Sequence, residues 1–305
     1  MTDSLKKYLL EDRTVRVQAV RLHDTWQQAQ AHHQYPPTIK RLLGELVAAS
    51  TLLAANIKFE GSLLLQIQGD GPIALVVVEC RSDLSLRATV KVREGHELPE
   101  DGTMQSLLNT RGEGRFMVIL DPKRKVPGQQ AYQGIVPLEG DTVAEVLQHY
   151  MKASEQLDTR LWLAADDTHV AGLLVQRLPD QGGLPQGNVD SDTWTRAIHL
   201  AGTLSGEELL QTDVDTLIHR LYWEETLTAF EPLPVRWFCP CTRDRVAGML
   251  RSLGAAEVQE ILAEQGKVEV SCDFCGKPYL FDPVDCAGLF AENKPMPEQN
   301  PPTMH

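Results

Sequence analysis

Four cysteines near the C-terminus constrain this chain more than any other feature. They occur as Cys239-Pro240-Cys241 and, after thirty intervening residues, as Cys272-Asp273-Phe274-Cys275, a spacing typical of a four-thiolate zinc site. Zinc holds its sulfurs at about 2.3 Å in a tetrahedron, which places them roughly 3.7–3.8 Å apart. Only a turn brings neighbouring cysteines so close, and Pro240 and Gly276 favour turns. The pattern predicts one zinc ion per reduced chain, with the ligands Cys239, Cys241, Cys272 and Cys275.

A structural site that only stabilises a small C-terminal domain is the plainest interpretation of these cysteines. The Cys-x-Cys pair favours a second role, because its disulfide would close a very small, strained ring and would be easily reduced again. Flanking basic residues favour ionised thiols, which bind metals and react with oxidants; they are Arg236, Arg243, Arg245 and Lys277. Metal binding and redox sensitivity are compatible here. Cys80 and Cys286 fall outside the pattern and are given no role.

The composition predicts an ordinary soluble protein. The chain has 305 residues, 42% of them hydrophobic and 23% charged, enough for one large core and a smaller domain. The N-terminal residues do not resemble a signal peptide, and the longest aliphatic run, Ile73 to Val78, is too short to span a membrane. We therefore expect a cytoplasmic protein with no membrane partner. In that reducing compartment a metal, not a disulfide, is the resting state of clustered thiols.

Negative charge is concentrated in one part of the sequence. Residues 180–235 carry 10 acidic and 2 basic residues, a net charge of −8 out of −13 for the whole chain. Nucleic acid selects for lysine and arginine through counterion release, so this balance argues against a nucleic-acid partner.

Alternating and helical apolar patterns predict the fold of residues 1–179. Helices are expected at about 23–34, after Pro36-Pro37, and from near Asp141. Groups of strands with few helices between them predict an α+β fold, with helices covering an antiparallel sheet. The strands are expected at 15–22, 62–68, 73–80, 84–92, 115–120, 132–138, 160–165 and 169–177.

Residues 180–235 are expected to form an acidic helical linker. It starts in a Gly/Pro break at 179–187, and Ser191, Ser205 and Asp213 are candidate helix caps. Short acidic helices are marginal alone, so the segment is either a linker whose apolar stripe is buried in the main domain or a metastable switch. The apolar residues that could bind another chain when exposed are Trp194, Ile198, Val214, Leu217, Ile218, Leu221, Tyr222 and Trp223.

Four segments resemble one known family. Two contain the cysteine pairs, Trp237 to Arg245 and Cys272 to Asp282, and the others run from Ala171 to Pro179 and from Arg220 to Glu225. These motifs, and the order of segments along the chain, resemble the bacterial thirty-three-kilodalton redox-regulated heat-shock chaperones, which are oxidation-activated holdases. The expected domains are then an α+β core (1–179), a metastable linker (180–235), a zinc-binding redox-switch domain (236–290) and a disordered tail (291–305).

The resemblance favours the switch interpretation of the linker and implies an ATP-independent chaperone, not an enzyme. Structural zinc contributes about 10–16 kcal/mol in small thiolate domains, so oxidation of the thiols should unfold the small domain and release the linker helices. The apolar surface exposed in this way would bind unfolded or partly folded client proteins. Proximity predicts the disulfides Cys239–Cys241 and Cys272–Cys275. Whether the activated form is a monomer or a homodimer stays open.

Two other functional classes stay open on the sequence. A thiol–disulfide oxidoreductase also uses Cys-x-x-Cys, but between a strand and a helix, whereas residues 272–275 lie between strand-like segments at 267–270 and 279–281. A zinc-ribbon adaptor that binds RNA or protein is the third class. Disulfide-reductase turnover would support the oxidoreductase, and salt-sensitive RNA binding the adaptor. The ATP-binding loop motif does not match at Gly276-Lys277, because Ser271 and Pro278 occupy positions that it reserves for other residues.

Overall fold

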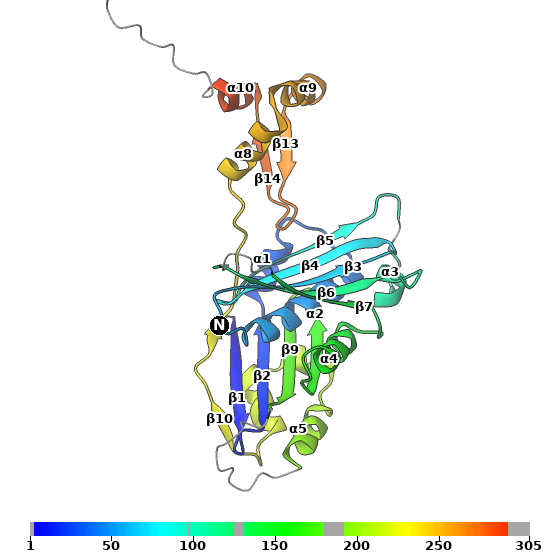
Figure 1. Cartoon of the computed structure of the whole chain (residues 1–305), viewed down its shortest axis with the longest axis vertical. Helices are drawn as coiled ribbons and strands as arrows, with labels where there is room; N and C mark the ends of the chain where they lie inside the picture. Colours follow the sequence, from blue (N-terminus) through cyan, green and yellow to red (C-terminus); the bar gives the residue numbers. More distant parts are fainter. Residues whose placement is uncertain (1–2, 97, 125–130, 180–191, 292–305) are drawn as a thin grey trace, which may run out of the picture. The chain divides into compact units, whose positions relative to one another are not determined.

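The computed structural model describes residues 3–96, 98–124, 131–179 and 192–291 (Figure 1). The chain divides into two compact units, Met1–Cys239 and Pro240–His305. Three sequence predictions lie outside the described residues: the break at 180–187, the cap at Ser191 and the tail at 292–305. Residues 192–235, predicted as a separate linker, belong to the first unit.

The first unit contains two sheets. The strand order of the first sheet is β10-β1-β2-β9-β8, with β11 also paired to β1, and that of the second is β12-β5-β4-β3-β6-β7. Neighbouring strands run antiparallel except β12 and β5, which are parallel. The first sheet comprises β1 (Ser4–Leu10), β2 (Val15–Leu22), β8 (Thr159–Ala165), β9 (Val170–Arg177), β10 (Leu227–Ala229) and β11 (Leu233–Pro234). The second comprises β3 (Gly61–Gln68), β4 (Ile73–Arg81), β5 (Ser85–Val92), β6 (Arg115–Pro122), β7 (Tyr132–Pro137) and β12 (Arg236–Trp237).

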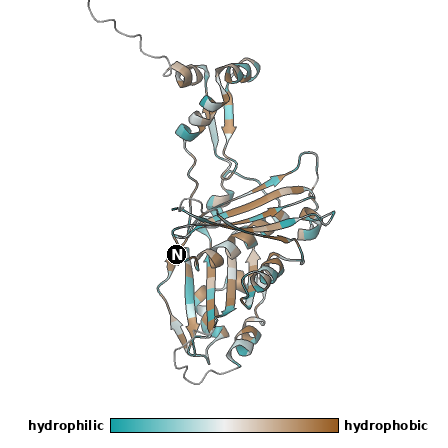
Figure 2. Cartoon of the chain, viewed as in Figure 1, coloured by the Kyte–Doolittle hydropathy of each residue, from teal (hydrophilic) through white to brown (hydrophobic). Residues whose placement is uncertain are grey.

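One helix, α2 (Pro37–Ala54), lies between the two sheets and contacts strands of both (Figure 1). Proline at its first position is preorganised for a helix start. A Cβ added at Gly44 would lie 2.4 Å from the Ala165 Cβ, so glycine allows the close approach of α2 to β8. Figure 2 shows hydrophobic residues along α2 and the central strands. The other helices are α1 (Asp24–Gln30), α3 (Met104–Leu108), α4 (Val143–Ala153), α5 (Thr193–Ala201), α6 (Gly206–Gln211) and α7 (Val214–Leu221).

The first sheet is buried on both faces, because successive side chains of a strand point to opposite sides. In β9, Val170 and Leu174 belong to the core around α2, whereas Leu173 and Val175 belong to a second core. Helices α5–α7 cover that second face.

The second unit is much smaller. A hairpin of β13 (Val268–Ser271) and β14 (Pro278–Phe281) packs with the helices α8 (Arg243–Leu253), α9 (Ala255–Gln265) and α10 (Pro283–Ala291). Its buried core residues are Ala247, Leu250, Val258, Val268, Tyr279, Phe281 and Cys286.

The predicted α+β class with antiparallel sheets and covering helices is confirmed, and the predicted strands within 15–177 occur close to their predicted bounds. Three differences stand out. The first unit has two sheets where one was predicted, the first helix ends at Gln30 rather than near residue 34, and β1 and β10–β12 were not predicted. No helix in the described ranges has the length and apolar character needed to span a bilayer.

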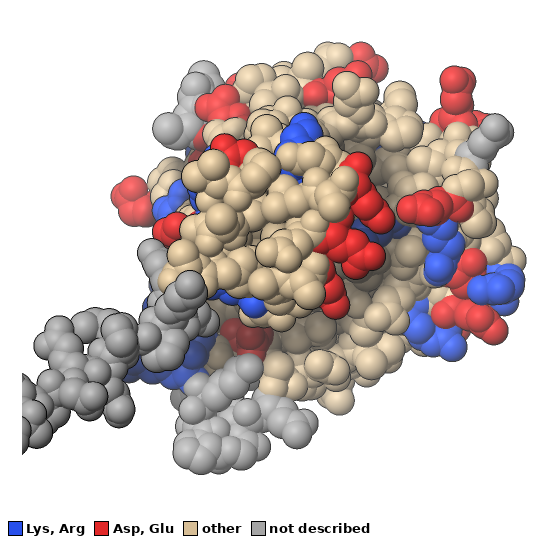
Figure 3. All heavy atoms as spheres, turned by 90° about the horizontal axis from the view of Figure 1, so that it is seen from above, with Lys and Arg blue, Asp and Glu red and all other residues tan. Residues whose placement is uncertain are grey.

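Charged side chains of both signs are interspersed on the face drawn in Figure 3, among large areas of uncharged surface. A nucleic-acid interface would show basic side chains gathered in a stripe or patch.

Candidate metal centre

The second cysteine pair lies in the tight turn of the β13–β14 hairpin. The Cys272 N–H donates to the Lys277 carbonyl (3.0 Å), and the Gly276 N–H donates to the Cys272 carbonyl (2.8 Å). Gly276 has φ +68°, a left-handed conformation that glycine adopts without a steric penalty. The predicted hairpin knuckle is confirmed, and its geometry differs from the strand-to-helix position of an oxidoreductase Cys-x-x-Cys.

The first cysteine pair lies between strand β12 and helix α8. Thr242 caps the helix, its side chain accepting from the Arg245 N–H (3.2 Å), and the Arg245 guanidinium donates to the Pro240 carbonyl (3.0 Å). These two contacts hold the turn that contains Pro240. Cys241 therefore precedes a helix N-terminus, where the helix dipole favours the thiolate.

The structure brings the four predicted ligands together. The sulfurs of Cys239, Cys241, Cys272 and Cys275 all lie within 4.8 Å of one another, and those of Cys241 and Cys275 are 3.4 Å apart. Cys275 is buried and the other three are half-buried. Zinc requires sulfurs roughly 3.7–3.8 Å apart, and four thiolates are a donor set that it prefers. The arrangement fits a closed, four-coordinate metal site.

Tyr279 of β14 lies beside the thiols. The pKa of its hydroxyl is raised, first by hydrogen bonding with Cys241, then by burial and by the charges of the cysteine sulfurs. Tyr279 therefore stays protonated and can donate toward a thiolate. The cysteine pattern alone did not point to it, although an aromatic residue four positions after Cys275 was visible in the sequence.

The basic residues around the cysteines are arranged differently from the prediction. Arg236 pairs with Asp83 (2.6 Å), and Arg243 pairs with Asp285 (2.7 Å) and covers the Phe281 ring at 4.2 Å. Both guanidinium groups are therefore neutralised by carboxylates. Arg243 links α8 to α10 and supports the small core.

The other two cysteines lie in apolar cores. Cys80 is fully buried in β4, and burial raises the pKa of its thiol. Cys286 is 2% exposed in α10, and burial also raises its pKa. Protonated, buried thiols are poor nucleophiles and poor ligands.

Most of the proposed client-binding residues are buried against the first sheet. The stripe of α7 and the residue after it, Leu217, Ile218, Leu221 and Tyr222, is at most 5% exposed. Trp194, Ile198 and Val214 pack at the margin of the same core, and Trp223 is 69% exposed. The side chains of Ser205 and Asp213 cap α6 and α7 as predicted.

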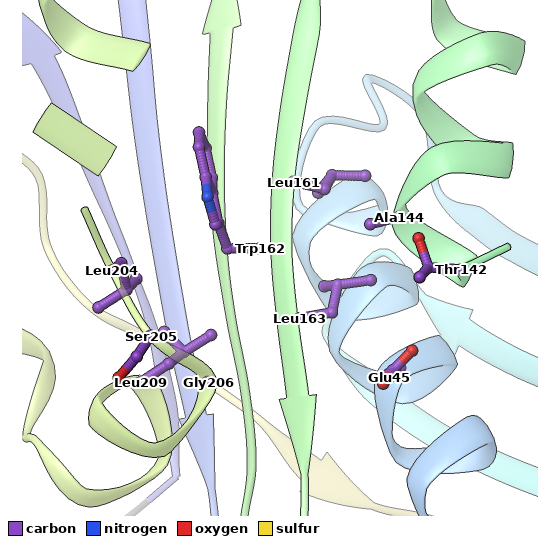
Figure 4. Close-up of a pocket in the computed structure, with 10 residues that line it drawn as sticks. All are labelled: Glu45, Thr142, Ala144, Leu161, Trp162, Leu163, Leu204, Ser205, Gly206 and Leu209. Carbon is purple, nitrogen blue, oxygen red and sulfur yellow. The ribbon is translucent and has the colours of Figure 1, made fainter. Parts of the chain in front are cut away.

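A cavity of about 220 Å³ lies at the free side of β8, in the first unit (Figure 4). Glu45 of α2, Thr142 and Leu163 line one part of it, and Leu204 and Gly206 line another. Burial raises the pKa of Glu45 to about 7, and the charge of Arg41 partly offsets that shift.

Comparisons with known proteins identify the family. The sequence model of the family described as "Hsp33 protein" matches residues 3–282. Two similar curated proteins are each named "33 kDa chaperonin". That of Methylobacillus flagellatus is 47% identical over 97% of both chains, and that of Chromobacterium violaceum is 44% identical over 94% of both.

A solved structure supports the same fold. The crystal structure of a 33 kDa chaperonin from Thermotoga maritima superimposes with a TM-score of 0.77 at 21% identity, covering 95% of this chain and 98% of the other. With the family match over nearly its whole length, its relatives at more than 40% identity and its four-thiol cluster, the chain belongs to the Hsp33 protein family.

Proposed function

We propose that this protein is a redox-regulated, ATP-independent chaperone that holds unfolding proteins and prevents their aggregation. The observation that carries the proposal is the cluster of four thiols, three of which belong to a unit with a small apolar core. The relatives named 33 kDa chaperonin support the chaperone part. The protein binds its clients passively and catalyses no reaction. A cytoplasmic location belongs to the proposal, because clustered thiols stay reduced in that compartment.

In the reduced state Cys239, Cys241, Cys272 and Cys275 hold one zinc ion. Bound zinc supplies about 10–16 kcal/mol of apparent binding free energy, which is folding free energy in a domain of this kind. The β13–β14 hairpin and the capped start of α8 present the sulfurs, and Tyr279 donates toward them. Because the apolar core of the second unit is small, folding of that unit depends on the bound metal.

Oxidation converts the four thiols into two disulfides. Each hydrogen peroxide molecule takes two electrons from a pair of cysteine thiolates, which form one S–S bond and give up their place on the metal; with two protons from solvent the peroxide leaves as two water molecules. Thiols that are close in sequence react most readily, which predicts Cys239–Cys241 and Cys272–Cys275. Peptide mapping of the oxidised protein checks this, and a majority of links between the two pairs contradicts it.

Loss of the metal site then acts on the first unit through the chain that precedes Cys239. Helices α5–α7 leave the first sheet and expose the stripe of Leu217, Ile218 and Leu221 together with the sheet face beneath it. The apolar surface exposed on the helices and on the sheet binds other unfolded chains. The acidic residues of 180–235 keep the opened protein soluble. Two opened copies can also associate, so a homodimer of the activated form belongs to the proposal.

The test follows aggregation of a chemically denatured client by light scattering, with the reduced and the peroxide-treated full chain. Zinc release is measured in parallel with a chromogenic chelator. We expect suppression only after oxidation, with the same time course as zinc release. Suppression that is equal before and after oxidation, or zinc release without suppression, contradicts the proposal.

A further inference from the structure

A segment just before the first cysteine pair forms edge strands on both sheets of the first unit. We call residues 227–238 the strap. β10 and β11 lie along β1, and β12 lies along β5 (β10 and β1 are neighbours in Figure 1). The strap thus covers the edges that β1 and β5 would otherwise present.

Backbone hydrogen bonds join the strap to β1. The Phe230 N–H donates to the Lys7 carbonyl (3.0 Å), and the Val235 N–H donates to the Asp3 carbonyl (2.9 Å). In an antiparallel pair, hydrogen-bonded positions alternate with positions whose N–H groups point outward. Pro234 pairs with Ser4 at an outward position, where proline loses no hydrogen bond to β1.

The strap also makes side-chain contacts: Leu227, Leu233 and Trp237 are half-buried against the two cores, and Arg236 pairs with Asp83 (2.6 Å). Within the strap Val235 is the one buried residue, at 5% exposure, while Phe230 and Phe238 are 48% and 40% exposed. By contrast, Leu5, Tyr8 and Leu10 of β1 are buried in the two cores of the unit. β1 is therefore held in the sheet by its own buried side chains and by its pairing with β2, contacts that do not depend on the strap.

The same strand also holds helix α7. The Lys6 ammonium pairs with the Asp215 carboxylate (2.5 Å), and the Tyr8 hydroxyl donates to the same carboxylate (3.4 Å). Release of α7 and release of the strap therefore expose one continuous surface, made of the edge of β1 and the adjoining sheet face.

We propose that the strap-facing edge of β1 binds clients by strand addition, and that the strap occupies this edge in the resting protein. The inference rests on the proposed chaperone function and specifies how a client binds. The ligand is an extended segment of an unfolded polypeptide. Main-chain hydrogen bonds supply the affinity and are independent of sequence, which suits a protein that binds many different clients. An unpaired edge strand is a template for any extended chain.

The probe is a fluorescent peptide with the strap sequence, residues 227–238, added to the full-length protein. We expect it to bind the oxidised protein, to bind the reduced protein at least about tenfold more weakly, and to compete with a denatured client. A second peptide carries N-methyl groups at Phe230 and Val235, which removes two hydrogen bonds to β1 and keeps every side chain. Its affinity should fall at least about tenfold.

A matched control peptide is methylated at Ala229. This residue pairs with Tyr8, between the hydrogen-bonded pairs formed by its neighbours, so its N–H points away from β1. We expect it to bind within about twofold of the unmodified peptide.

Amide hydrogen exchange gives a second readout on the unmodified protein. The N–H groups of Lys7 and Leu9 face the strap, and those of Lys6 and Tyr8 face β2. Oxidation should expose the first pair, a bound client should protect it again, and the second pair should stay protected throughout.

The outcomes separate the inference from the proposed function. An oxidised protein that never suppresses aggregation overturns both. An oxidised protein that suppresses aggregation but does not bind the strap peptide, or binds the doubly methylated peptide equally well, overturns strand addition alone. Strand addition is also overturned if amide hydrogen exchange at Lys7 and Leu9 stays unchanged when a client binds.

Discussion

The two compact units of this protein are stabilised in different ways. The first unit buries two large apolar clusters around its sheets, with Trp26, Leu46 and Phe116 at most 1% exposed. The second unit buries a small cluster around Phe281 and contains three of the four clustered thiols, those of Cys241, Cys272 and Cys275. Hydrophobic burial does not depend on oxidants, whereas thiolate ligands do. Under the proposed function, this difference gives one chain both a durable scaffold and a part that responds to redox state.

The largest effect that tests this difference is loss of a metal ligand. Cys272→Ser should abolish stoichiometric zinc binding and unfold the second unit, since the metal contributes about 10–16 kcal/mol there. Zinc content by mass spectrometry and near-ultraviolet circular dichroism measure both. Cys80→Ser is the control, because Cys80 is buried in the first unit and should leave zinc content unchanged. Full zinc retention by the Cys272 variant removes the basis for the comparison.

A core truncation should show the reverse behaviour. Leu46→Ala removes a fully buried side chain between the two sheets and should destabilise the first unit by about 2–5 kcal/mol, whether or not zinc is present. Phe281→Ala, in the second unit, should be destabilising only while zinc is bound, because that unit is already unfolded once a chelator removes the metal. Denaturant unfolding with and without chelator separates the two. Equal zinc dependence of both variants would show that the units do not differ in this way.

A charge placed under helix α7 tests whether that helix can detach while the scaffold stays folded. Leu217 is 1% exposed, so Leu217→Asp should weaken its packing by about 1–3 kcal/mol and give partial holdase activity without oxidant. Amide exchange should increase in 214–222 and stay slow in β3 and β4. His219→Gln, at an exposed position of the same helix, is the surface control. A variant that loses protection but stays inactive would assign client binding to another surface.

Glu45 predicts a pH dependence of the first unit. Its folded pKa of about 7 lies above its ordinary value of 4.5, so the native state binds the proton more tightly than the unfolded state does. This contribution is complete below about pH 4.5 and is lost as the pH rises through 7. Unfolding at pH 5, 6, 7 and 8 should show that Glu45→Gln flattens a decline on the order of 1 kcal/mol. Identical pH profiles for both proteins would contradict the prediction.

The smallest effect concerns the ion pair between Lys6 and Asp215, whose carboxylate is on an exposed side chain (70%). Asp215→Asn should change stability by about 0–1 kcal/mol, because solvent screens such pairs. Thermal unfolding of the reduced protein measures it, with high salt as the control that should remove the difference. A much larger loss would mean that β1 holds α7 chiefly through charge and not through the apolar stripe.

The sequence allowed more to be predicted for some regions than for others. Strands such as 73–80 and the helix after Pro36-Pro37 have clear apolar periodicity, and the cysteine spacing identified the four sulfurs that the structure brings together. Strand β1 was missed because Lys6 and Lys7 interrupt its apolar alternation. β10–β12 are two or three residues long, and their pairing with residues more than 100 positions away leaves no local pattern.

The ion-pair partners of charged residues also could not be predicted from the sequence. Arg243 was predicted to favour ionised thiols because it is close to them in the chain, yet it pairs with Asp285, 42 residues away. Such partners follow from how α8 and α10 pack. Local spacing therefore identified the predicted ligands, whereas the charged and aromatic residues around them could be identified only from the tertiary structure.

A proline of the strap has a consequence for self-association. Pro234 lies where an outward N–H would be available to the next strand, and proline has none. In the language of polymer chemistry, the strap is a chain terminator, since the sheet cannot grow past it by recruiting a strand from another molecule. If the strap left, the edge of β1 would become free to pair with a strand from another molecule. Under the proposed function, the strap would therefore block self-association of the chaperone through β1 until oxidation releases that edge.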